Sequence, residues 1–109
     1  MLAISVTKGE HGRRLNLTGE LDMETLAMLE QAAELQEGER QLEINLAGVS
    51  FIDSTGLRGL LEIRRRWSRQ GGEVRVINPC PEIAEVFRLV GVEELLDYSG
   101  QGKAAGGES

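Results

Sequence analysis

The stretch Phe51-Ile52-Asp53-Ser54-Thr55-Gly56-Leu57 decides how this chain is organised, because an apolar run ends in hydroxyl side chains where a helix begins. Asp53 and Ser54 offer the oxygen acceptors that are typical of helix starts. Downstream, apolar residues recur at helical spacing: Leu57, Leu60, Leu61 and Trp67. Ser54 is therefore predicted at a helix N-terminus. It either caps the helix, a contribution of about 1 kcal/mol, or it offers a hydroxyl on which a charge can be placed.

Upstream of this stretch, the sequence predicts a β-hairpin followed by a helix. Apolar and polar residues alternate over 2–7 and again over 14–18, with a turn over 9–12 between them. Asp22 then has the character of an N-cap for a helix that carries Leu26, Leu29 and Ala33 and ends near Gly38.

The remaining pattern alternates strands and helices. A strand over 42–46 leads through a loop at Gly48 to the Ser54 helix, which runs to about Gln70. Three more elements are expected: a strand over 74–77, a helix over 83–90 and a short strand near 95–96.

This order of elements predicts an α/β fold with a single open mixed β-sheet. The N-terminal hairpin is antiparallel, and the two strand-helix-strand crossovers that follow favour parallel pairing, with the helices packed on the sheet. A chain of 109 residues forms one domain, predicted over 1–98. Residues 99–109 are rich in glycine and alanine and are predicted to form a disordered tail.

Composition limits the partners and the compartment. A net charge of -6 argues against nucleic acid and against an anionic membrane surface, because both are bound through Lys and Arg. Cys80 is the only cysteine, so no intrachain disulfide forms and a cytoplasmic location is expected. The segment 1–5 has neither the basic flank nor the apolar core of a signal peptide.

The residues needed for common enzyme chemistry are scarce. His11 is the only histidine and lies in the hairpin turn, so Ser54 has no evident base. The glycine-rich loops that bind nucleotide phosphates are missing, and a phospho-aspartate receiver centred on Asp53 would need a lysine better placed than Lys8 or Lys103. We expect a protein that is not an enzyme and holds no cofactor or metal.

Three stretches carry a resemblance to the anti-anti-sigma factors of the STAS domain family. These are Leu17-Thr18-Gly19-Glu20-Leu21-Asp22, the quoted 51–57 stretch and Gly71-Gly72-Glu73-Val74. They occur in the family's order and spacing, and the similarity covers about residues 1–98. The resemblance implies a STAS-like fold and places the phosphorylated serine of the family at Ser54.

The resemblance also implies partners. A member of this family binds an anti-sigma factor with a serine kinase fold when it is unphosphorylated, is released when that kinase phosphorylates it, and is restored by a serine phosphatase. The implied binding surface comprises Asp22, Asp53, Ser54, Thr55, Gly56, Leu57 and Arg58. The glycine at position 56 has two possible reasons: it lets the partner approach closely, or it lets the helix pack tightly inside the domain.

An alternative function within the same family is a structural interaction module, such as a stressosome subunit or an accessory subunit of a transport system. A switch protein is expected to be a monomer or small oligomer, whereas a stressosome subunit forms large particles. Two departures from the family are noted: Thr55 stands where a second serine is common, and the glycine-rich end predicts that a closing helix is absent or very short. Met23, Met28 and Trp67 are predicted to pack in or against the core.

Overall fold

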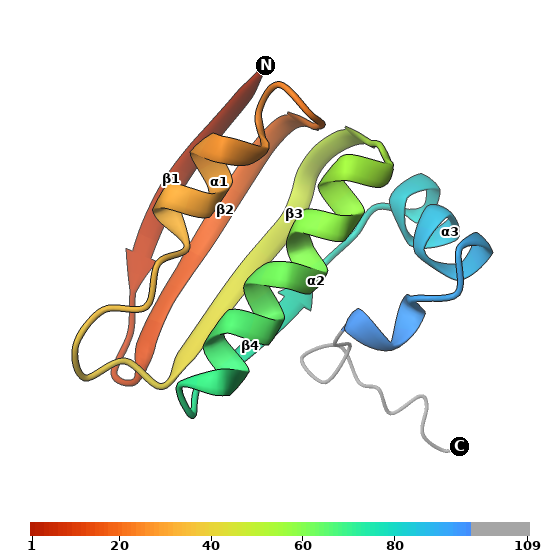
Figure 1. The fold of residues 1–109 in the computed structure, drawn as a ribbon. Coiled ribbons are helices and arrows are strands. Elements are labelled where there is room, and N and C mark those ends of the chain that lie inside the picture. Colours follow the sequence, from red (N-terminus) through yellow and green to blue (C-terminus); the bar gives the residue numbers. More distant parts are fainter. Residues whose placement is uncertain (97–109) are drawn as a thin grey trace.

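Four strands form one sheet in the computed structural model, which describes residues 1–96. The strands lie in sequence order: β1 (Leu2–Lys8), β2 (Gly12–Leu21), β3 (Gln41–Ile52) and β4 (Glu73–Ile77). β1 and β2 are antiparallel, whereas β2, β3 and β4 are parallel (Figure 1). The predicted mixed sheet is confirmed, while the predicted tail over 99–109 lies outside the described residues.

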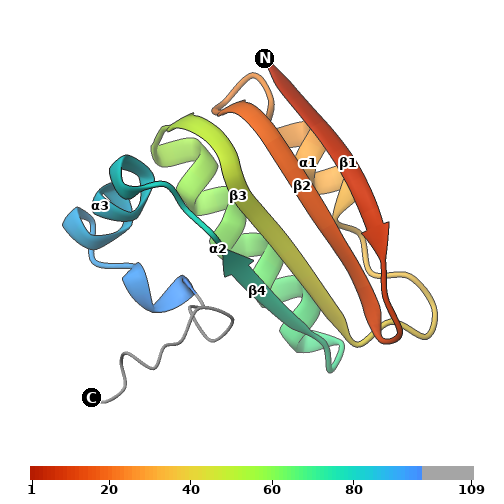
Figure 2. The same cartoon turned by 180° about the vertical axis from the view of Figure 1, so that it is seen from behind.

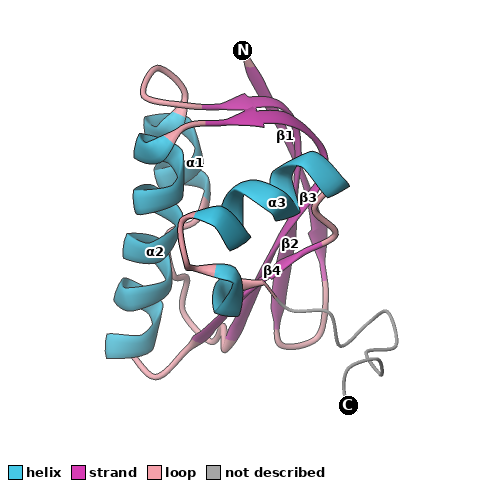
Figure 3. Cartoon of the chain, turned by 90° about the vertical axis from the view of Figure 1, so that its right-hand side faces the viewer, coloured by secondary structure: helices cyan, strands magenta, loops and turns pink. Residues whose placement is uncertain are grey.

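Two helices cover one face of this sheet. α1 (Leu26–Ala32) connects β2 to β3, and α2 (Ser54–Arg69) connects β3 to β4 (Figure 3). α2 ends at Arg69, within one residue of the predicted end near Gln70, and is followed by Gly71, whose φ of +83° suits glycine. α3 (Pro81–Leu89) confirms the helix that the spacing over 83–90 predicted; it follows β4 and packs against β3.

The predicted final strand near 95–96 is reduced to one bridge. A short 3-10 helix, η1 (Glu93–Leu95), occupies most of this segment, and only Leu96 pairs with Val76. A single bridge adds little to the sheet, so the expectation of a fifth strand was wrong for the described residues.

The core lies between the sheet and the helices. Alternating leucines of β2 and aliphatic residues of β3 and β4 meet the apolar stripe of α2, as their period of two predicts. Trp67 is 1% exposed, and its Nε1 donates a hydrogen bond of 2.7 Å to the Ala33 carbonyl. The predicted packing role of Trp67 is confirmed, and this bond fixes the end of α1 against α2.

The opposite face of the sheet is polar. The sheet lies in front of α1 and α2 when seen from behind (Figure 2). Glu43 pairs with Arg14 at 2.9 Å and with Arg75 at 3.3 Å across three strands. Cross-strand pairs of opposite charge such as these stabilise neighbouring strands on a solvent-facing side of a sheet.

α1 is shorter than the sequence predicted, ending at Ala32 rather than near Gly38. The cause is a buried arginine: Arg13 of β2 donates to the carbonyls of Ala32 at 2.5 Å and Glu34 at 2.8 Å and pairs with Glu39. Carbonyl oxygens at the C-terminal end of a helix need hydrogen-bond donors from elsewhere. The Arg13 guanidinium provides these bonds, and the chain then turns toward β3.

β3 is longer than predicted and runs through Gly48, where a loop was expected. The register against β2 shifts twice, between Asn16 and Thr18 and between Gly19 and Glu20. Gly48 permits this because a Cβ there would lie 2.8 Å from the Leu17 carbonyl oxygen. A register shift moves side chains to the other face of a sheet, which explains why Phe51 is not buried as its apolar run predicted.

Candidate functional site

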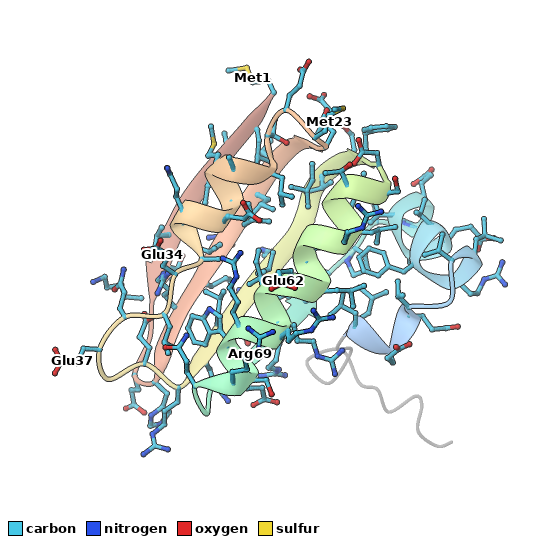
Figure 4. All side chains as sticks on the ribbon, in the orientation of Figure 1. Met1, Met23, Glu34, Glu37, Glu62 and Arg69 are labelled. Carbon is cyan, nitrogen blue, oxygen red and sulfur yellow. The ribbon has the colours of Figure 1, made fainter. Side chains whose placement is uncertain are left out.

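The candidate site forms where β2 and β3 end together. These strands are parallel and pair Leu21 with Ile52, so the residues that follow both strands meet at one edge. The Asp53 amide donates a hydrogen bond of 3.3 Å to the Leu21 carbonyl. We call the surface formed by residues 20–25 and 51–58 the Ser54 edge. Figure 4 shows Met23 of this edge at the end of the molecule remote from Glu37 and Arg69.

Asp53, not Ser54, caps α2. Its side chain accepts a 2.8 Å hydrogen bond from the Gly56 amide, and its carbonyl accepts one of 3.0 Å from Leu57. Ser54 occupies the first helical position and is exposed. No hydrogen bond engages its hydroxyl within residues 1–96, so the capping interpretation of Ser54 was wrong.

Asp22 organises the neighbouring turn, although it is not the N-cap of α1 as predicted. That position belongs to Thr25. The Asp22 carboxylate accepts hydrogen bonds from the amides of Glu24 at 3.0 Å and Thr25 at 3.2 Å. Asp22 thus caps the turn that precedes α1 rather than α1 itself. These bonds shape the turn that directly follows Leu21, whose carbonyl accepts the hydrogen bond from the Asp53 amide.

The predicted surface residues after Ser54 differ in exposure. Arg58 is exposed and makes no ion pair in the described part of the chain, whereas Thr55 is half-buried. Gly56 and Leu57 are buried, and a Cβ on Gly56 would lie 2.5 Å from the Leu21 carbonyl oxygen. Gly56 thus has a packing role, and Leu57 belongs to the hydrophobic core beneath the Ser54 edge.

Two apolar residues at this edge were predicted to be buried and are not. Met23 is 74% exposed and Phe51 is 50% exposed. Met28, on α1, is also 48% exposed, so its predicted packing role was wrong as well. The signal available in the sequence was only the position of Met23 in a turn between Asp22 and Glu24, and nothing in the pattern marked Phe51.

The Ser54 edge is acidic. Its residues include four carboxylates and one basic side chain, Arg58. The carboxylates belong to Glu20, Asp22, Glu24 and Asp53. The Met1 amino group pairs with Glu20, and that hydrogen bond raises the pKa of the amine above its ordinary value. In residues 1–96, no group of three or more His, Cys, Asp or Glu side chains is placed to hold a metal ion.

Comparison with known proteins gives the family. The family model described as "Mlab, STAS domain" matches residues 4–97. The chain therefore belongs to the STAS domain family, as the sequence motifs indicated. None of the helices described is long and apolar enough to cross a membrane.

Several relatives are anti-sigma factor antagonists. The anti-sigma-B factor antagonist of Bacillus subtilis (strain 168) is 30% identical over 105 residues, which cover 95% of this chain and 94% of that protein. Among solved structures, unphosphorylated SpoIIAA, an anti-sigma factor antagonist, gives a TM-score of 0.71 at 22% identity and covers 95% of this chain and 97% of its own. The phosphorylated form of the Bacillus cell fate determinant SpoIIAA gives a TM-score of 0.62 at 24% identity. The match covers 87% of this chain and 89% of the SpoIIAA chain. At these identities the structures show a shared fold.

Proposed function

We propose that this protein is an anti-sigma factor antagonist controlled by phosphorylation of Ser54. In its unmodified form it binds an anti-sigma factor with a serine kinase fold, and the sigma factor held by that kinase is released. The names of the relatives support the antagonist assignment, and the site supports the phosphorylation. The protein is the substrate of the kinase rather than a catalyst.

The observation that carries the proposal is the free hydroxyl of Ser54. The helix start is already capped by Asp53, so esterification of Ser54 removes no hydrogen bond from the domain. The Ser54 side chain is exposed at the end of the molecule, where a kinase active site can reach it. A free, accessible hydroxyl at a helix N-terminus also has unpaired amides nearby that can bind a phosphate.

Phosphate transfer supplies the switch. The Ser54 oxygen attacks the γ-phosphorus of ATP, the bond to the β-phosphate oxygen breaks, and the serine proton leaves to a base of the kinase or to water. The products are phospho-Ser54, with a charge of about -1.5 to -2, and ADP. Phospho-Ser54 then faces both ADP and the carboxylates of Asp22 and Asp53, and this repulsion separates the proteins.

A serine phosphatase removes the modification, because water replaces the serine oxygen on phosphorus, which regenerates the Ser54 hydroxyl and releases inorganic phosphate. Arg58 lies four residues after Ser54, a spacing that brings side chains together on one helix face. After phosphorylation, Arg58 is available to pair with the phosphate. Before it, the same side chain is available to the partner.

Titration calorimetry with the purified kinase tests this function. We expect Ser54→Ala to bind as tightly as the unmodified protein but to accept no phosphate from ATP. Ser54→Asp should bind about tenfold or more weakly, because like charges brought together at an interface oppose binding. Equal affinities of the two variants would contradict the electrostatic switch.

Phosphopeptide mass spectrometry supplies the control for position. Phosphate should appear on Ser54 after incubation with the kinase, ATP and magnesium. Thr55 is half-buried and serves as the neighbouring hydroxyl for comparison. Phosphate found on Thr55 alone would overturn the assignment of the switch to Ser54.

A further inference from the structure

Two large apolar side chains at the Ser54 edge are left uncovered. Phe51 exposes 50% and Met23 exposes 74% of its surface. Fully burying an exposed side chain of this size is worth roughly 1.5–3 kcal/mol, so the isolated domain forgoes part of that stabilisation at each residue. Exposed apolar patches that are rimmed by polar residues mark interaction surfaces.

The backbone holds both side chains outward. The register shift between Gly19 and Glu20 places Phe51 opposite Glu20, away from the core. Met23 lies in the turn that the Asp22 carboxylate fixes through the amides of Glu24 and Thr25. The strand register and the Asp22 turn therefore cause the exposure of Phe51 and Met23.

The charges around this pair indicate what covers it. Four carboxylates belong to the same edge: Glu20, Asp22, Glu24 and Asp53. A complementary surface has an apolar pocket for Phe51 and Met23 and a rim of Lys or Arg side chains. A second copy docked through the same edge would bring two such sets of carboxylates together, which repulsion opposes.

We propose that Met23 and Phe51 are the apolar anchors through which the kinase that phosphorylates Ser54 docks on this chain. The inference rests on the proposed function and extends it. Phe51 and Met23 fill an apolar pocket on the kinase, basic groups of the kinase contact the surrounding carboxylates, and Ser54 is thereby presented to ATP. Affinity comes from the anchors, while the hydroxyl carries the switch.

A matched pair of double variants tests the anchors. Met23→Ala/Phe51→Ala removes them, and Met28→Ala/Val6→Ala removes apolar side chains that are 48% and 51% exposed on α1 and β1. The probe is the kinase purified from native lysate by following phosphate transfer from ATP to Ser54. Calorimetry gives the dissociation constant, and phosphorylation kinetics give KM and kcat separately.

We expect the anchor variant to raise the dissociation constant and KM about tenfold or more, as removal of central interface residues does, with kcat nearly unchanged. The matched variant should behave as the unsubstituted chain. Both should melt near its temperature, because the altered side chains are exposed. An unchanged KM for the anchor variant, or equal weakening by both variants, would overturn the inference.

Two further outcomes separate the inference from the proposed function. Transfer of phosphate to Ser54 of the anchor variant with unaltered affinity refutes the anchors alone and leaves the switch standing. If no kinase in the native lysate phosphorylates Ser54 of the unsubstituted chain, both the proposed function and the proposed docking partner are refuted. Self-association of the unsubstituted chain that the anchor variant abolishes, seen by size-exclusion chromatography, would assign the surface to a second copy and contradict the inference.

Discussion

Asp53 and Ser54 are adjacent in sequence but have separate tasks at the start of α2. Asp53 faces the helix and accepts a hydrogen bond from the Gly56 amide at 2.8 Å, while Ser54 is exposed. Because one residue supplies the cap, the next is free to be modified without disturbing it. This separation is a property of single side chains and is best tested one residue at a time.

Substitution at Asp53 should cost stability, whereas substitution at Ser54 should not. We expect Asp53→Ala to lower the free energy of unfolding by about 0.5–2 kcal/mol, the usual effect of losing an N-cap. Ser54→Ala should change it little, because its hydroxyl makes no hydrogen bond in the described structure. Urea denaturation measures both values.

Asp53→Asn is the control, because the amide oxygen keeps the acceptor and should retain most of the stability. Equal losses for Asp53→Ala and Ser54→Ala would show that the two side chains share the cap.

At the scale of elements, the glycines of α2 set how closely this helix approaches its neighbours. A Cβ on Gly56 would lie 2.5 Å from the Leu21 carbonyl oxygen, which is backbone at the end of β2. A Cβ on Gly59 would lie 2.3 Å from Leu26 Cδ1, the end of a flexible side chain of α1. The first contact cannot relax unless a strand moves, whereas the second can relax by a rotamer change.

These two glycines form a matched pair. Both gain about 1 kcal/mol of helix propensity on substitution by alanine. We expect Gly56→Ala to destabilise the domain by about 1–3 kcal/mol through overpacking and Gly59→Ala to be milder. Urea denaturation of both variants compares them, and a Gly56→Ala domain at least as stable as Gly59→Ala would contradict the close approach of α2 to β2.

At the scale of the whole molecule, the proposed phosphorylation switch acts on a surface rather than on the fold. The acidic Ser54 edge lies at one end of the domain, and the core between the sheet and the helices does not reach Ser54. A phosphate there is favoured by the N-terminus of a 16-residue helix and opposed by Asp22 and Asp53. The two effects oppose each other, so the domain should stay folded.

Calorimetry of the phosphorylated protein tests this. We expect its Tm to lie within about 5 °C of the unmodified value, since 1 kcal/mol shifts the Tm of a domain this size by roughly that amount. Dephosphorylated protein from the same preparation is the control. A much larger loss of Tm would show that phosphorylation acts by unfolding the domain.

The sequence predicted most of the elements because they follow local rules. Period-two alternation identified β1, β2 and β4, while the cap residues Asp53 and Ser54 indicated the start of α2 and Gly71 its end. The failures have long-range causes. The end of α1 depends on Arg13, which is 19 residues from the Ala32 carbonyl that it contacts, and the length of β3 depends on its pairing with β2.

The candidate site divides in the same way. Sequence alone determined that an aspartate and a serine begin a helix after a strand, because caps and periodicity are encoded by neighbours. Only the tertiary structure decided that Asp53 takes the cap, that Gly56 and Leu57 are buried, and that Met23 and Phe51 face outward. These outcomes depend on how β2 and β3 align, and strand register is fixed by contacts between residues far apart in the chain.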